Sequence, residues 1–448
     1  MLRLLPAALA VALITGCAHV DPYNVIGRQV VDEQGLPTTP VPGPRKERLD
    51  VEERERAFDF VWSTIRDRYY DKTLNGVDWE AVGRNYRPLA MRALDDEAFW
   101  DVLDRMTGEL KDAHTRVESP RRVALRKLDQ SVTLGFSFAP IENRLAVTAV
   151  SPESDAWWAG VRPGMTLARI NNEDAQTAYA RLIEGTRYDS TERSRHLRAI
   201  RRLMAGEEGT RVPFTFERAD GSRFDAILGR AKLSYRPTAT HRILPSGYGY
   251  LRLTQWTLGV MPRALAGLKA LENTPGLVVD LRGNPGGSLH AVNALLSRFF
   301  EKKTQLGRVL TRTGQPVSLL FGALEIIKLQ PQVQGDPEAY KGPVVVLVNS
   351  SSGSGSEYFA ATMQAAGRAV VAGEQSCGCL LGFLGYARIP GGGELAYSEV
   401  GFVMSNGKRI EGEGVIPNHH IPLTLADLRA SRDRALEEAQ AILRSMPK

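Results

Sequence analysis

Two segments of the chain join an apolar, strand-forming run to a turn of small residues and then to a helix-forming stretch. One is GLVVDLRGNPGGSLHAVNALL, which begins at Gly276, and the other is GPVVVLVNSSSGSGSEYFAA, which begins at Gly342. Further apolar strands and helical stretches alternate around them, a pattern typical of an α/β domain. Loops that follow strands carry most binding and catalytic groups. Residues 237–424 are therefore predicted to form an α/β core whose functional site lies in these turns.

The residues on either side of this core show other patterns. Between 49 and 127, charged and apolar residues alternate at helical spacing, which predicts an N-terminal helical module. Between 128 and 236, short apolar runs broken by turn residues predict a small β-rich domain. Residues 425–448 are predicted to form one amphipathic helix that packs on the surface.

The N-terminus, MLRLLPAALAVALITGC, has the composition of a secretory signal. Its apolar run is too short for a permanent membrane span, and Cys17 after small residues resembles the bacterial lipobox, in which the thiol is acylated. Residues 1–16 would then be the signal peptide and residues 17–48 a lipid-anchored, Pro-rich tether. Ala18 favours the outer membrane, facing the periplasm, as the place of this cell-envelope protein. The alternative is an ordinary cleaved signal with a chance cysteine.

Charge gives little indication of a nucleic-acid partner. The 448 residues include 57 basic and 51 acidic side chains, a net charge of +6 that is not concentrated in one long run. The densest basic stretch is RSRHLRAIRRLM, residues 193–204. It is interpreted as a solvated helix face, the alternative being a contact with acidic headgroups or substrate.

The serine-rich turn after the second apolar strand has the features of a nucleophile site. A serine at a strand–helix junction is exposed at the end of the sheet, and the first free N–H groups of the helix point toward any oxyanion formed there. In the first segment, the consecutive amides of Gly286 and Gly287 can form an anion-binding nest. A capping serine would be the simpler interpretation of the second turn by itself.

Together the two turns resemble those of the C-terminal-processing (tail-specific) serine peptidases and their tricorn-like relatives, from about residue 51 to 422. The resemblance implies a crotonase/ClpP-like β-α spiral as the core and an inserted PDZ-like domain at 128–236. Such domains take an extended peptide as an added strand. The stretch LGFSF is similar to their carboxylate-binding loop, which would consist of Leu134, Gly135, Phe136, Ser137 and Phe138.

The family pattern N-x-x-S-A-S-A-S-E falls on residues 349–357 and implies Ser354 as the nucleophile, with Ser352 and Ser356 as packing or capping hydroxyls. In the classical branch the general base is a lysine, but Cys379 stands at that position. In the tricorn-like branch the base is a histidine, and KDAHT resembles its element, which implies His114.

The RIEGEGVIPN stretch implies Glu411 as the carboxylate that orients the imidazole, directly or through a bridging group. Glu413 is an alternative carboxylate and His290 an alternative base. Amides of Gly286, Gly287 and Gly355 would surround the oxyanion. Cys377 and Cys379 are either buried thiols or a structural pair.

The resemblance implies a serine endopeptidase that hydrolyses extended or C-terminal segments of polypeptides through an acyl-enzyme, with no metal ion and no cofactor. The missing lysine motivates one alternative, a catalytically silent, PDZ-containing envelope adaptor that binds peptides. A hydrolase of non-peptide acyl bonds is a third possibility. The sequence predicts membrane association only through the N-terminal lipid, and no nucleic-acid partner.

Overall fold

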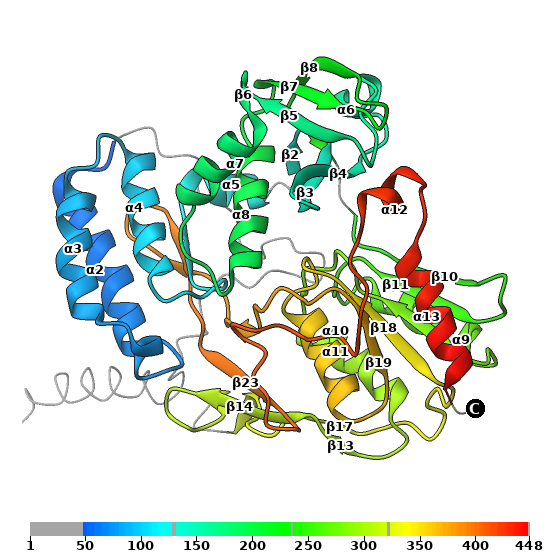
Figure 1. Ribbon diagram of the computed structural model, residues 1–448. Coiled ribbons are helices and arrows are strands. Elements are labelled where there is room, and N and C mark those ends of the chain that lie inside the picture. The colour runs from blue at the N-terminus through cyan, green and yellow to red at the C-terminus, as the bar shows by residue number, and fades with distance from the viewer. Residues whose placement is uncertain (1–47, 128–130, 234–235, 320–322, 447–448) are drawn as a thin grey trace, which may run out of the picture.

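The computed structural model describes residues 48–127, 131–233, 236–319 and 323–446 (Figure 1). The predicted signal peptide, Cys17 and the tether up to residue 47 lie outside the described residues. Within the described ranges, no helix is long and apolar enough to cross a membrane.

The N-terminal module is helical, as predicted. Each of its three long helices begins at an aspartate, Asp50, Asp78 or Asp95, whose side chain accepts a hydrogen bond from a backbone N–H of the first turn. Their inner faces pack into one apolar core. The module consists of α2 (Val51–Arg68), η1 (Leu74–Gly76), α3 (Trp79–Met91), α4 (Asp96–Gly108), β1 (Arg116–Glu118) and α5 (Pro120–Lys127).

The β-rich unit lies beyond this module and is built on a sheet in the order β3-β4-β5-β7-β8, with β6 paired to β5. Its core is aromatic, since Phe136, Phe138, Phe214 and Phe216 are all buried. β2 and β9 pair where the chain enters and leaves the unit. The elements are β2 (Ser131–Thr133), β3 (Phe136–Ile141), β4 (Arg144–Val150), α6 (Asp155–Trp158), β5 (Thr166–Ile170), β6 (Glu173–Asp174), α7 (Ala175–Glu184), α8 (Glu192–Met204), β7 (Arg211–Glu217), β8 (Arg223–Gly229) and β9 (Ala231–Leu233).

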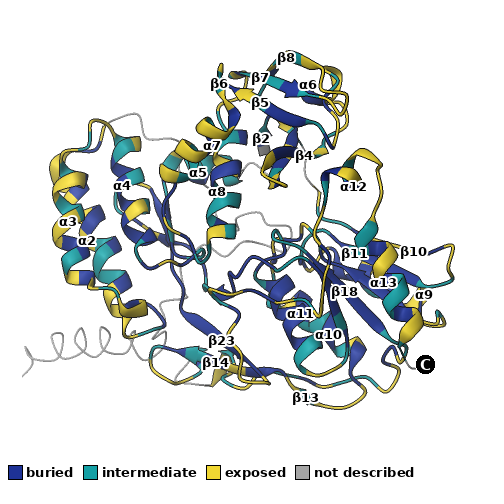
Figure 2. Ribbon diagram, viewed as in Figure 1, coloured by how far each residue is buried: buried dark blue, intermediate teal, exposed yellow. Residues whose placement is uncertain are grey.

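The remaining chain forms an α/β core around a six-stranded sheet in the order β10-β11-β12-β18-β19-β24. β10 and β11 are antiparallel and the other neighbours are parallel. Every residue of the central strands β12 and β18 is buried, which explains their unbroken apolar sequences (Figure 2). The strands are β10 (Ala239–Ile243), β11 (Gly249–Leu253), β12 (Leu277–Asp280), β18 (Val344–Val348), β19 (Val370–Gly373) and β24 (His419–His420).

Helices cover both faces of this sheet. One face packs against α9 (Met261–Ala270), α10 (Leu289–Leu296) and α11 (Gly355–Ala365). The other face packs against the C-terminal helix, through Leu436, Ala439 and Leu443. The single helix expected at 425–448 is in fact two, α12 (Leu425–Arg429) and α13 (Arg434–Ser445). The chain turns between them because Ser431 has a φ of 50° and Asp433 caps α13.

Short strands complete the core and connect it to the N-terminal module. β1 pairs with β22, so the segment that follows His114 is anchored directly to the core. The sheet β14-β23-β20 and the pairs β13-β17 and β15-β16 lie below the main sheet in Figure 1. These elements are η2 (Ser297–Phe299), β13 (Thr304–Gln305), β14 (Gly307–Thr311), β15 (Val317–Leu319), β16 (Leu324–Ile327), β17 (Gln332–Val333), β20 (Leu381–Gly382), β21 (Ala387–Arg388), β22 (Glu394–Ala396) and β23 (Val400–Met404).

A buried carboxylate fixes the end of β12 just before the glycine-rich turn. Asp280 accepts hydrogen bonds from the Tyr250 hydroxyl and from the guanidinium groups of Arg252 and Arg282. Burial alone would raise its pKa, but these partners hold the pKa of Asp280 below its usual value. Arg282 extends the network to Asp433 at the surface.

We expect Asp280→Asn to lower the free energy of unfolding by about 3 kcal/mol, because it removes the buried carboxylate that pairs with the half-buried guanidinium groups of Arg252 and Arg282. Asp433→Asn, at the exposed end of the same network, should cost less than about 1 kcal/mol. Denaturant unfolding of both variants measures the difference. Equal losses of unfolding free energy in the two variants would show that the buried Asp280 contributes no more to stability than the exposed Asp433.

Candidate active site

Ser354 stands at the junction between β18 and α11, as the sequence predicted. It is the N-cap residue of α11, and its φ of 50° lies in the left-handed region that non-glycine residues rarely adopt. This backbone turns the hydroxyl outward at the end of the sheet and places it beside the free N–H groups of the helix. Ser352 and Ser356, which were expected to be packing or capping groups, are buried. Ser352 donates to the Leu281 carbonyl, and Ser356 donates to the Asn284 carbonyl.

His114 belongs to the N-terminal module, and its side chain lies beside Ser354. Its Nε2 lies 3.3 Å from Ser354 Oγ, although the two residues are 240 positions apart. Burial lowers the pKa of His114, and although Asp112 opposes this shift, the pKa remains below its usual value. The imidazole is thus neutral at pH 7, the state in which it can accept a proton.

A set of arginines holds the loop that carries His114. Arg187 is buried and donates to the backbone carbonyls of Asp112 and Thr115. Arg198 donates to the carbonyl of Ala113, and Arg116 donates to that of His114. Arg187 and Arg198 belong to the β-rich unit, so this unit fixes the histidine loop as well as lying beside it.

The Asp112 carboxylate closes the same loop from within. It accepts the N–H of His114 at 2.7 Å and the hydroxyl of Thr115, and it is fully buried. It is therefore the acidic group that acts most strongly on the imidazole.

The structure shows no hydrogen bond between Glu411 and His114. Within the described chain, His114 Nδ1 and both carboxylate oxygens of Glu411 are buried without a hydrogen bond of good geometry. Burial raises the pKa of Glu411 well above its usual value, Asp112 adds to this, and Ser190 opposes it. The Ser190 hydroxyl also accepts the N–H of Ala113, next to His114. The alternative carboxylate, Glu413, is exposed.

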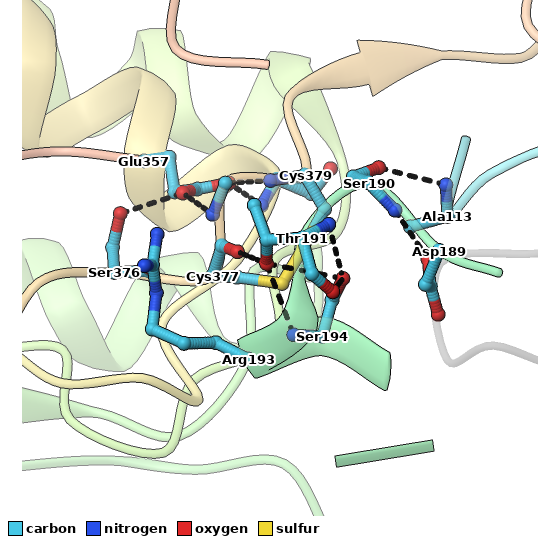
Figure 3. Close-up of a disulfide and its surroundings, with 12 residues drawn as sticks. Ala113, Asp189, Ser190, Thr191, Arg193, Ser194, Glu357, Ser376, Cys377 and Cys379 are labelled. Carbon is cyan, nitrogen blue, oxygen red and sulfur yellow. Dashed lines mark hydrogen bonds between the residues drawn. A yellow bond between two sulfur atoms is a disulfide. The ribbon is translucent and has the colours of Figure 1, made fainter. Parts of the chain in front are cut away.

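Glu357 is a functional candidate that the sequence analysis missed. It is fully buried, and its carboxylate accepts four hydrogen bonds, from the Ser376 hydroxyl and from the N–H groups of Gly378, Cys379 and Ser354 (Figure 3). Burial raises the pKa of Glu357 to about 7, although these bonds oppose the rise. The spacing S-x-x-E, typical of a capping box, was the sequence signal that could have revealed it.

A disulfide joins Cys377 and Cys379, which settles the pairing that the sequence left open. The loop around it stands where the classical branch would place its lysine. Its carbonyl at Cys379 accepts the N–H of Ser354, and its carbonyl at Cys377 accepts the hydroxyl of Thr191, at the start of α8. The disulfide loop therefore supports the nucleophile through its backbone.

The three predicted oxyanion glycines have different roles. The N–H groups of Gly287 and Gly355 make no hydrogen bond to any described residue. The N–H of Gly286 donates to Asn284, so it does not point at an oxyanion. Gly286 has a φ of 107°, and a Cβ there would lie 2.6 Å from that of Ser354. This glycine thus allows the two turns to meet.

Ser354, His114, Gly287 and His290 line one cavity of about 2040 Å³. His290 is exposed at the start of α10, in a position to contact a substrate. The five residues of the predicted carboxylate loop lie elsewhere: Leu134, Phe136 and Phe138 are buried in the β-rich unit, Gly135 accepts the N–H of Ser151, and Ser137 is exposed. No group of side chains suited to a metal ion occurs in the described ranges.

Comparison with known proteins finds two family models that match parts of the chain. Residues 247–421 match the model of Peptidase family S41, and residues 50–108 match that of the Tricorn protease C1 domain. The chain is 24% identical to the carboxyl-terminal-processing protease of Picosynechococcus sp. over 85% of its length and 86% of that protein. It is 26% identical to tricorn protease homolog 1 of Streptomyces coelicolor over 87% of its length, but spans only 35% of that protein.

Solved structures share the fold. The photosystem II D1 C-terminal processing protease aligns over 88% of this chain and 97% of its own, with 22% identity and a TM-score of 0.56. Mature CPAF bound to lactacystin aligns over 88% and 98%, with 16% identity and a TM-score of 0.65. Residues 247–421 are thus similar to an S41 peptidase and residues 50–108 to a tricorn C1 domain. Over most of its length, the chain is similar to carboxyl-terminal-processing proteases.

The buried Glu357 predicts a specific dependence of stability on pH. Because its folded pKa of about 7 exceeds the usual value of 4.5, the folded state keeps this proton longer than the unfolded state. The free energy of unfolding should therefore fall as pH rises from about 4.5 to 7 and then level off. In Glu357→Gln this contribution is absent, so the variant should gain about 1–3 kcal/mol relative to the wild type between pH 5 and pH 8.

Denaturant unfolding at both pH values tests this expectation. Glu413→Gln, which changes an exposed carboxylate, is the control and should show no such relative gain. If the free energies of unfolding of Glu357→Gln and the wild type differed by the same amount at pH 5 and at pH 8, Glu357 would ionise at its ordinary pKa.

Proposed function

We propose that this protein is a serine endopeptidase that cleaves polypeptides through an acyl-enzyme at Ser354, with His114 as the general base. The observation that carries the proposal is the 3.3 Å approach of His114 Nε2 to Ser354 Oγ inside a cavity that is large enough for an extended peptide. A serine hydroxyl is a poor nucleophile at neutral pH unless such a base removes its proton.

In the acylation step, Ser354 Oγ attacks the scissile carbonyl carbon while its proton moves to His114 Nε2. The carbonyl oxygen gains the negative charge. It is stabilised by the free N–H of Gly287, in the glycine-rich turn, and by that of Gly355, at the start of α11. The intermediate collapses when His114 returns the proton to the departing amine, which leaves an ester on Ser354. A water molecule, activated in turn by His114, then hydrolyses this ester.

Two buried carboxylates would stabilise the imidazolium that forms. Asp112 acts on His114 from within its own loop, and Glu411 would act through intervening groups, of which Ser190 lies beside both segments. A positive charge on His114 favours an ionised Glu411, and an ionised Glu411 favours the imidazolium. The two protonation states thus support each other during the reaction.

The β-rich unit would supply extended polypeptide. Within the described chain, β3 pairs only with β4, so no described strand pairs with its other edge. We infer a PDZ-like role for this unit from that open edge, as in strand-addition domains. Anchoring by lipid at Cys17, in the cell envelope and facing the periplasm, remains part of the proposal. A peptide-binding adaptor is the alternative, because Glu411 does not reach His114.

Incubation of the full-length chain with unfolded polypeptides, read by intact mass, tests the proposal. The wild type should cleave, and Ser354→Ala and His114→Ala should lose at least about a thousandfold in rate. Ser350→Ala, in the same turn, and His290→Ala should stay within a few-fold of the wild type. If neither the wild type nor any variant cleaves while all of them still bind peptide, the protein is better described as an adaptor.

A further inference from the structure

Arg201, one of the arginines that line the cavity, has no side-chain partner among the described residues. The basic stretch of residues 193–204 forms α8, and three of its arginines, Arg198, Arg201 and Arg202, line the cavity that holds Ser354. Arg198 pairs with Asp189 at 2.6 Å, and Arg202 lies 3.4 Å from Asp101. The Arg201 guanidinium makes no hydrogen bond or ion pair with any residue that the structure describes.

The surroundings of Arg201 favour an anion. Burial lowers its pKa, and the repulsion from Arg198 adds to this effect, while the one opposing carboxylate, Asp189, is already paired. Ten arginine and lysine side chains line the cavity against five aspartates and glutamates. Of those acids, Asp101 and Asp104 are held by arginines. A carboxylate from outside would therefore find an unpaired guanidinium in a positive field.

The position of Arg201 along α8 sets its distance from the disulfide loop that supports the reacting serine. At its start, α8 touches the disulfide loop through Thr191, which donates to Cys377. Ten residues of helix separate Thr191 from Arg201, a rise of about 15 Å. An extended peptide covers this length in four or five residues. The cavity reaches both ends of this span, since Cys377 and Arg201 line it.

We propose that Arg201 is a specificity subsite that binds a carboxylate of the substrate polypeptide four or five residues from the scissile bond. The carboxylate is either the free C-terminus or an aspartate or glutamate side chain, because a guanidinium takes both in the same bidentate geometry. The inference rests on the proposed peptidase function and adds a determinant of substrate choice. It also gives the basic stretch on α8 a role beyond that of a solvated helix face.

Matched fluorogenic peptides test the subsite on the full-length chain. One set carries a single glutamate or glutamine at successive positions on both sides of the scissile bond, and a second set ends in a free acid or an amide. At one position of the carboxylate relative to the scissile bond, the wild type should have a KM about tenfold lower for the carboxylate peptide than for its matched neutral peptide. The set that shows this preference identifies the source of the carboxylate.

Variants then assign the preference to Arg201. Arg201→Gln should abolish the tenfold preference, and Arg201→Lys should retain part of it. Arg201→Glu should favour a lysine at the same register. Arg181→Gln removes a surface arginine from α7 in the same unit and should leave the preference intact. Since Arg201 makes no hydrogen bond or ion pair with a described residue, unchanged melting temperatures are expected and should be verified.

Failure of the subsite and failure of the peptidase are distinguishable. If the wild type cleaves all peptides and Arg201→Gln shows the same preference as the wild type, the subsite is wrong and the peptidase stands. If nothing is cleaved, fluorescence anisotropy of the same peptides measures Kd directly. A tenfold tighter Kd for the carboxylate peptide that depends on Arg201 would still support the subsite, and equal Kd values would overturn it.

Discussion

A buried arginine underlies the arrangement of the site. Arg187 pairs with Asp104 and donates to the carbonyls of Asp112 and Thr115, so that the loop carrying His114 is fixed from the β-rich unit. Loop carbonyls that are buried need donors, and an arginine provides several in one rigid plane. This contact fixes the loop that carries His114, and the pairing of β1 with β22 ties the following segment to the core that carries Ser354.

The loop around Cys379, where the resemblance to the classical branch implies a lysine, has a cysteine there and makes backbone contacts with the site. It supports Ser354 with a carbonyl and anchors its own amides on Glu357. The disulfide between Cys377 and Cys379 lies within this support. In the proposed mechanism the base is His114, whose pKa is lowered by burial although Asp112 opposes this shift.

The sequence predicted the parts of this structure that depend on local pattern. The apolar strands β12 and β18, the turns after them and the serine at the start of α11 follow from residues close together in the chain. The identity of His114 came from a motif resemblance. Arg187 and Ser190 could not be predicted, because their contacts with the histidine loop join segments that are distant in sequence. The use of the Gly286 N–H by Asn284 likewise depends on the folded turn.

The central claim is that His114 activates Ser354, and covalent labelling tests it most directly. The full-length chain should react once with a fluorophosphonate, with the added mass mapped to Ser354, and His114→Ala should slow this reaction by at least about a hundredfold. His290→Ala should react at the wild-type rate. Labelling of Ser354 at an equal rate in His114→Ala, or labelling of another serine in the wild type, would contradict the account.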